Sequence, residues 1–182
     1  MDNWTDSNGR EWQTHDGVPI PLGAEATGQP AQLHTSEAIE RFMLGGNATF
    51  TLVSEASGTR FTYKVQKPED FNPNRPILFV KVLTGADNES DYSYIGQLVP
   101  TSSSASYFRY SHGKKARIGV AAQSVKAIAW FVAHLLGPQG RGLPNGVLFY
   151  HEGRCGRCNR TLTVPSSIEM GFGPDCAEAV GI

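Results

Sequence analysis

The three cysteines of this 182-residue chain all lie near its end, as Cys155, Cys158 and Cys176. The first two form a C-x-x-C pair, whose thiolates can hold one tetrahedral Zn²⁺ from a tight turn. The third follows Pro174 in a segment that ends at Gly181, a pattern typical of a short helix. Such a turn, together with a thiolate in the first turn of a helix, is half of a treble-clef or zinc-ribbon site. The tail is therefore predicted to be a small structural zinc module.

The cysteine spacing leaves the fourth zinc ligand open. His151, four residues before Cys155, is the leading candidate because a strand that runs into the pair can turn its imidazole onto the metal. Gly156, inside the pair, is predicted to supply the positive φ that the turn needs. The alternatives for the fourth ligand are a water molecule, a partner chain, His112, His134 and Asp175.

Other interpretations of the cysteines compete with zinc. A redox pair usually stands in a βαβ context, whereas this pair lies between an apolar strand and an arginine-rich segment. Three cysteines are odd in number and too few for a disulfide framework. Bound iron, or cysteines that serve only as small apolar residues, stay open. Zinc fits this sequence context best.

The net charge of −1 conceals an asymmetry along the chain. Residues 107–160 carry nine Lys or Arg and one acidic residue. Residues 1–48, in contrast, carry two basic and seven acidic residues. A concentrated basic segment of this kind indicates a polyanionic partner.

Two clusters within the basic segment suit nucleic acid. Arg154, Arg157 and Arg160 flank the C-x-x-C pair, and their guanidinium groups can contact phosphates bidentately. The second cluster interleaves rings for base stacking with cations for phosphate neutralisation. Its members are Tyr107, Arg109, Tyr110, Lys114, Lys115 and Arg117. Each cluster can instead be a solvated surface, and an acidic protein would attract the same charges.

The sequence contains no familiar catalytic motif. There is no P-loop, no G-x-G-x-x-G after a strand, no H-E-x-x-H and no G-x-S-x-G. The acidic loop 85–91 lacks the Gly and the distal Glu of an EF-hand, so a solvated turn is the simpler interpretation. In the stripe Lys126, Trp130 and His134, the Trp is either a stacking platform or the edge of a core. The chain is interpreted as non-enzymatic.

Periodicity and turn residues predict the secondary structure. A helix is predicted over 36–44, capped by Thr35 or Ser36, with Ile39, Phe42 and Met43 on its buried face. A longer helix is predicted over 125–136, capped by Ser124. Alternation and β-branched or aromatic content predict the strands 48–54, 60–66, 77–84, 92–99, 106–111, 117–120 and 147–151.

These elements indicate an α+β protein with a mostly antiparallel sheet, one long helix and a small C-terminal zinc module of treble-clef or zinc-ribbon type. The expected divisions are a flexible acidic arm at 1–34, an α+β domain at 35–146 and the zinc module at 147–182. The longest apolar stretch is too short to span a bilayer, and the polar first twenty residues contain no signal peptide. Together with reduced cysteines, these features favour the cytoplasm.

The tail also resembles a short uncharacterised module of phage and bacterial proteins. The resemblance rests on C-G-R-C-x-R-x-L from Cys155, a Pro-x-Ser, and G-x-G-P-x-C ending at Cys176, and it covers about twenty-five residues. The segments that begin at Ala48 and Arg60 are also similar to small phage proteins with this tail. The resemblance implies a phage or prophage origin, the cytoplasm of a host cell and zinc at the cysteines, but no activity.

The functional prediction is a phage-type accessory protein that binds Zn²⁺ and nucleic acid, either DNA or RNA. The alternative is a phage-encoded inhibitor that binds a host protein, for example a defence nuclease complex. In that case the acidic segment 1–48 would mimic nucleic acid, or the basic region would dock on an acidic partner. The sequence leaves the oligomeric state open.

Overall fold

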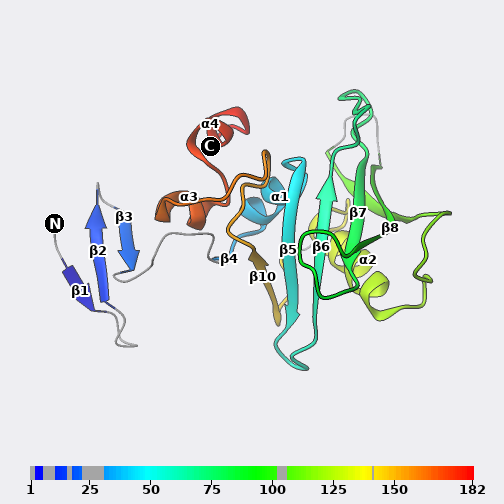
Figure 1. Ribbon diagram of the computed structural model, residues 1–182, viewed down its shortest axis with the longest axis horizontal. Helices are drawn as coiled ribbons and strands as arrows, with labels where there is room; N and C mark the ends of the chain where they lie inside the picture. Colours follow the sequence, from blue (N-terminus) through cyan, green and yellow to red (C-terminus); the bar gives the residue numbers. More distant parts are fainter. Residues whose placement is uncertain (1–2, 6–10, 16–17, 22–30, 102–105, 141) are drawn as a thin grey trace.

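The computed structural model describes residues 3–5, 11–15, 18–21, 31–101, 106–140 and 142–182. Its largest element is a seven-stranded sheet with the order β4-β10-β5-β6-β7-β8-β9 (Figure 1). Every neighbouring pair is antiparallel. The strands are β4 Ala31–Leu33, β5 Asn47–Ser54, β6 Arg60–Gln66, β7 Leu78–Leu83, β8 Tyr92–Pro100, β9 Phe108–His112 and β10 Val147–His151. The predicted antiparallel α+β architecture is thus present.

Helix α2 (Gln123–Leu135) covers one face of this sheet (Figure 1). The ring of Phe131 stacks on that of Phe149 in β10, with centroids 6.1 Å apart. The hydroxyl of Tyr63 in β6 donates to the carbonyl of Ser124 at 2.7 Å. The same helix also contacts β9, the last strand of the sheet. Because one helix contacts strands from both ends of the order, the sheet curves around it.

Helix α1 (Ser36–Leu44) confirms the prediction made from its periodicity. The side-chain oxygen of Thr35 accepts a hydrogen bond from the backbone N–H of Ala38 at 3.2 Å, so Thr35 is the N-cap. Ile39, Phe42 and Met43 are fully buried. The helix thereby places the Phe42 ring beneath the C-terminal segment.

Two local predictions are wrong. Residues 117–120 form turns and bends rather than a strand. Ser124 lies inside α2, and the N-cap residue is Ala122, which makes no side-chain capping bond. The described residues form four helices, of which α2 is the longest; α4 Pro174–Ala179 lies where a short helix was predicted, whereas α3 Pro165–Met170 was not predicted. No described helix is long and apolar enough to cross a bilayer.

A second, three-stranded antiparallel sheet lies within the segment that was predicted to be a flexible arm. It consists of β1 Asn3–Thr5, β2 Glu11–His15 and β3 Val18–Pro21. Trp4 and Trp12 are partners in the register of β1 and β2. Strand β3 is at an edge of this sheet, the position in which proline is tolerated. The other residues of 1–30 lie outside the described part of the chain.

The division at residue 147 stays a prediction, but the C-terminal segment is not separate from the main sheet. Its first element, β10, pairs with both β4 and β5. The Phe149 ring of β10 contacts Phe131 of α2, Phe50 of β5 at 4.6 Å and Phe42 of α1 at 6.0 Å. One strand therefore connects the hydrophobic core to the cysteines.

We expect Phe149→Ala to lower the free energy of unfolding by about 3–5 kcal/mol, because it leaves a cavity among three aromatic neighbours. Urea denaturation followed by circular dichroism measures this change. The matched control is Leu148→Ala, whose half-buried side chain is on the opposite face of the same strand. Equal losses in the two variants would contradict the proposed central role of Phe149.

Candidate metal centre

The C-x-x-C pair lies in a small hairpin that follows β10. The backbone N–H of Cys155 donates to the carbonyl of Arg160 at 2.9 Å, and that of Leu162 donates to Gly153 at 2.8 Å. Asn159 has a φ of 61°, the left-handed conformation that a polar residue adopts in a tight turn. The hairpin therefore holds Cys155 and Cys158 in a fixed turn.

Gly156 is needed for a different reason from the one predicted. Its φ is not among the positive values of the described residues. Instead, a Cβ atom at this position would lie 2.8 Å from the Phe42 ring and 3.0 Å from the Phe42 carbonyl oxygen. The carbonyl of Gly156 also accepts a hydrogen bond from the N–H of Asn47 at 2.8 Å. Close backbone packing against α1, rather than turn geometry, requires glycine here.

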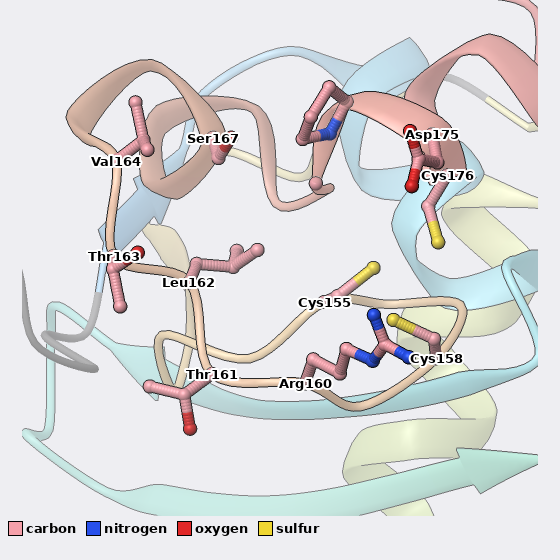
Figure 2. A pocket seen from close by; sticks show the side chains of 12 residues that line it. Cys155, Cys158, Arg160, Thr161, Leu162, Thr163, Val164, Ser167, Asp175 and Cys176 are labelled. Carbon is pink, nitrogen blue, oxygen red and sulfur yellow. The ribbon is translucent and has the colours of Figure 1, made fainter.

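The three cysteines come together as the sequence predicts. Their Sγ atoms all lie within 4.8 Å of one another, with Cys155 and Cys158 from the hairpin and Cys176 from α4 (Figure 2). A tetrahedral Zn²⁺ with Zn–S bonds of about 2.3 Å needs sulfur atoms about 3.8 Å apart. Small side-chain rotations are enough to reach that separation. The donor set therefore fits a thiophilic ion such as Zn²⁺.

The surroundings affect the ionisation of the two buried thiols in opposite directions. Burial raises the pKa of Cys155, but backbone hydrogen bonds from Cys158, Arg157 and Gly173 together hold that pKa below its ordinary value. Burial raises the pKa of Cys176, and the other two cysteines raise it further. The protein itself therefore stabilises the Cys155 thiolate, whereas the Cys176 thiolate needs a cation nearby.

His151 does not take part in the cysteine cluster. The residue is fully buried, and its Nε2–H donates to the carbonyl of Ile168 at 2.6 Å. Its Nδ1 accepts a hydrogen bond from the N–H of Gly153 at 3.0 Å. Both ring nitrogens are thus occupied, and the ring centroid lies 5.3 Å from that of Phe42. The structure places this histidine as a buried connection between β10 and α3, not beside the sulfur atoms.

The other predicted candidates for the fourth ligand differ in whether they lie near the cysteines. Nδ1 of His112 lies 3.2 Å from the Tyr110 hydroxyl, and Nδ1 of His134 lies 3.0 Å from the Trp130 carbonyl. Neither histidine belongs to the cluster. Asp175, in contrast, lines a cavity of about 180 Å³ beside the three cysteines, as Figure 2 shows. This cavity leaves room for a water molecule, the Asp175 carboxylate after rotation, or a donor from a partner.

The three arginines around the pair have different environments. Arg154 pairs with the Glu89 carboxylate at 2.8 Å. Arg157 is exposed, and its Nη1 lies 4.0 Å from Sγ of Cys176. Arg160 is also exposed and lines the cavity beside the sulfur atoms. Two of the three guanidinium groups thus remain open to solvent at the hairpin.

The second predicted cluster lies at the opposite end of the sheet. Strands β5, β6, β7 and β8 separate β10 from β9. Arg109 and Tyr107 are exposed, but the Tyr110 hydroxyl donates to the carbonyl of Ile95 at 2.7 Å and its ring is half-buried. The turn after β9 exposes three cations, Lys114, Lys115 and Arg117. The two basic clusters therefore do not form one contiguous patch.

Two further predictions concern exposed side chains. In the loop 85–91, the Asp87 carboxylate accepts hydrogen bonds from the N–H groups of Glu89 and Ser90, and the Asp91 carboxylate accepts one from Asp87. These carboxylates cap their own turn, as a solvated loop requires. Trp130 is 46% exposed and its ring packs 4.5 Å from that of His134, so it lies at the surface of α2.

Comparisons with known proteins cover only the tail of the chain. Residues 149–181 match the model of a family of unknown function, DUF6011. No curated protein and no solved structure matches the chain. The matched segment contains the hairpin, α3 and α4, and thus all three cysteines. The phage origin that the resemblance implies stays a prediction.

Protein purified without added metal is expected to contain about one zinc ion per chain, measured by elemental analysis. Cys158→Ser should lose the ion and destabilise the tail, because one thiolate of the cluster is removed. The matched control is Ser166→Ala, a change in α3 outside the cavity lining, which should retain the metal. Metal-free protein with a fully folded tail would refute the assignment.

The ring of His151 is expected to stay neutral at pH 6.5, because burial lowers its pKa more than the Ile168 hydrogen bond raises it. The unfolded chain binds this proton near pH 6.5, so the free energy of unfolding should fall as the pH drops from about 6.5 toward the folded pKa. NMR titration of the ring measures the pKa of His151 in the folded protein, and the same titration of urea-unfolded protein gives the reference value. A midpoint at or above 6.5 in the folded protein would contradict it.

Proposed function

We propose that the chain is a zinc-stabilised, non-enzymatic protein that binds nucleic acid. The observation that carries this proposal is the position of Arg157 and Arg160, which are exposed on the hairpin that the cysteines fix. The hairpin fixes the backbone from which these side chains project, and the planar fork of a guanidinium group matches phosphate oxygens. In this proposal the metal ion has a structural role, and the arginines make the contacts to the phosphates.

Zinc would be held by Cys155, Cys158 and Cys176, together with a fourth donor that enters through the cavity. When bound, the ion supplies charge neutralisation for the thiolates and a link between the hairpin and α4. Helix α4 has six residues, too few to be stable without tertiary contacts. The link therefore fixes the orientation of Arg157, whose guanidinium group lies beside Cys176.

The turn after β9 supports the same function from the other end of the sheet. Lys114, Lys115 and Arg117 are exposed, and none of them forms an ion pair with another described residue. Cations without protein partners are free to neutralise phosphates. An acidic protein surface would meet the same charges, so a protein partner is the alternative outcome of the test below.

The test is fluorescence anisotropy with labelled single- and double-stranded DNA and RNA. Binding should weaken linearly in a plot of log affinity against log salt between about 50 and 200 mM salt. Arg157→Ala combined with Arg160→Ala should weaken binding and reduce the salt slope by about 0.7–0.9 for each lost phosphate contact. The matched control is Lys126→Ala, which removes an exposed cation from α2.

Absence of binding to all four probes at low salt would refute the nucleic-acid function. Binding that is insensitive to salt would also contradict it, because phosphate neutralisation always releases counterions. The double variant must retain its zinc, measured in the same preparation, so that lost contacts are distinguished from lost structure. In either case, an acidic protein surface would become the expected partner of these cations.

A further inference from the structure

The face of the sheet that points away from α2 has a composition unlike that of an ordinary solvated surface. We call it the outer face. It is made by residues that alternate with the buried ones along β6 to β9, where Tyr63, Val65, Val80 and Val82 face α2 and are buried. Because side chains alternate along a strand, the residues between them point outward.

Two rows of side chains cross the outer face in register. In the first row, Lys64 of β6 is paired with Lys81 of β7, and Lys81 with Tyr94 of β8. The second row contains Gln66, Phe79, Gln97 and Ser111 from β6 to β9. Rings, cations and amides therefore occupy adjacent positions on three neighbouring strands.

Of the aromatic pair at the centre of this face, Phe79 is exposed to solvent and Tyr94 is half-buried. Phe79 is 37% exposed, and its ring lies edge-on to that of Tyr94 with centroids 5.8 Å apart. The core lies on the other side of the sheet, so Phe79 contributes nothing to it. A solvent-exposed phenylalanine on a strand, flanked by a lysine and two glutamines, is suited to stack on a flat partner.

The outer face also connects the two separated basic clusters. At its β10 side, Lys64 donates to the carbonyl of Glu89 at 2.9 Å, and the Glu89 carboxylate pairs with Arg154. At its other side, Gly113 packs so closely on the Tyr94 ring that a Cβ atom would collide with it. Gly113 begins the turn that exposes Lys114 and Lys115. Each cluster thus borders one end of the same face.

Charge and size then select the partner. Lys64, Lys81 and Arg109 line the outer face, and the acidic groups that act on Lys64 are Glu152, which follows β10, and Asp87 and Glu89 in the loop between β7 and β8. The three strand spacings from β6 to β9 span about 14 Å, long enough for a few nucleotides. Paired bases in a duplex hide their flat surfaces, whereas single strands expose them to aromatic side chains.

We propose that the outer face is the binding surface for single-stranded nucleic acid, with Phe79 and Tyr94 stacking on bases and the flanking cations meeting phosphates. This inference rests on the proposed nucleic-acid function and adds to it the strand state, the surface and the stacking residues. Gln66 and Gln97, on either side of Phe79, have amide groups that can reach the edges of a stacked base.

The experiment compares a twelve-nucleotide oligothymidylate with an abasic sugar-phosphate strand of the same length. Phe79→Ala should weaken binding to oligothymidylate about 5- to 150-fold, the effect of losing one stacked base. The same variant should bind the abasic strand as the wild type does, because no base is present to stack. Phe79→Tyr keeps a ring and should retain affinity. Trp130→Ala, which removes an exposed ring from α2, is the matched control and should bind normally.

The outcomes separate this inference from the more general function. Wild-type protein that binds no nucleic acid overturns both. Binding that requires Arg157 and Arg160 but is unchanged in Phe79→Ala overturns only the outer face. Photo-crosslinking of an oligonucleotide that contains 5-iodouracil, mapped by mass spectrometry on the wild-type protein, is independent of any substitution. Crosslinks at Phe79 or Tyr94 support the inference, and crosslinks elsewhere overturn it.

Discussion

The packing of the Phe42 ring is the contact on which the C-terminal segment depends. Its centroid lies 6.0 Å from that of Phe149 in the core strand and 5.9 Å from that of Phe172. Gly156 and Gly171 approach the same ring so closely that a Cβ at either position would lie within 2.8 Å of it. The cysteine hairpin and the turn after α3 therefore close around one side chain of α1, and the C-terminal segment shares its core with the sheet.

This packing explains why a metal ion would add stability at this place. The hairpin and the helices α3 and α4 are short, and α3 and α4 have six residues each. Phe42 packs against the hairpin at Gly156 and against Gly171 and Phe172, which precede α4, while the sulfur atoms join the hairpin directly to α4. An ion that joins three thiolates there neutralises charge that burial otherwise disfavours, most of all at Cys176, whose pKa burial raises.

The sequence predicted what depends on local pattern and could not predict what depends on packing. Helix α1, the main strands and the meeting of the three cysteines follow from periodicity, caps and spacing. His151 has suitable chemistry and spacing for a ligand, but burial against Phe42 and a bond to Ile168 decide its role. The strands β1 to β3 are short and β3 contains two prolines, a pattern that is typical of a loop. The distance between the basic clusters depends on strand order, which no local pattern contains.

The order of the strands also explains why the ring of Phe79, which packs on Tyr94, is exposed to solvent. Along β7, Phe79 alternates with buried apolar residues, so both faces of the strand carry an apolar side chain at this point although only one face is covered. A second layer on that face would bury it, but the described helices that contact the sheet are α1, α2 and α3, and α2 covers the inner face of β6 to β9. The exposed ring packs only against Tyr94 among the described aromatic rings. A flat, anionic partner on this face, as proposed above, would cover it.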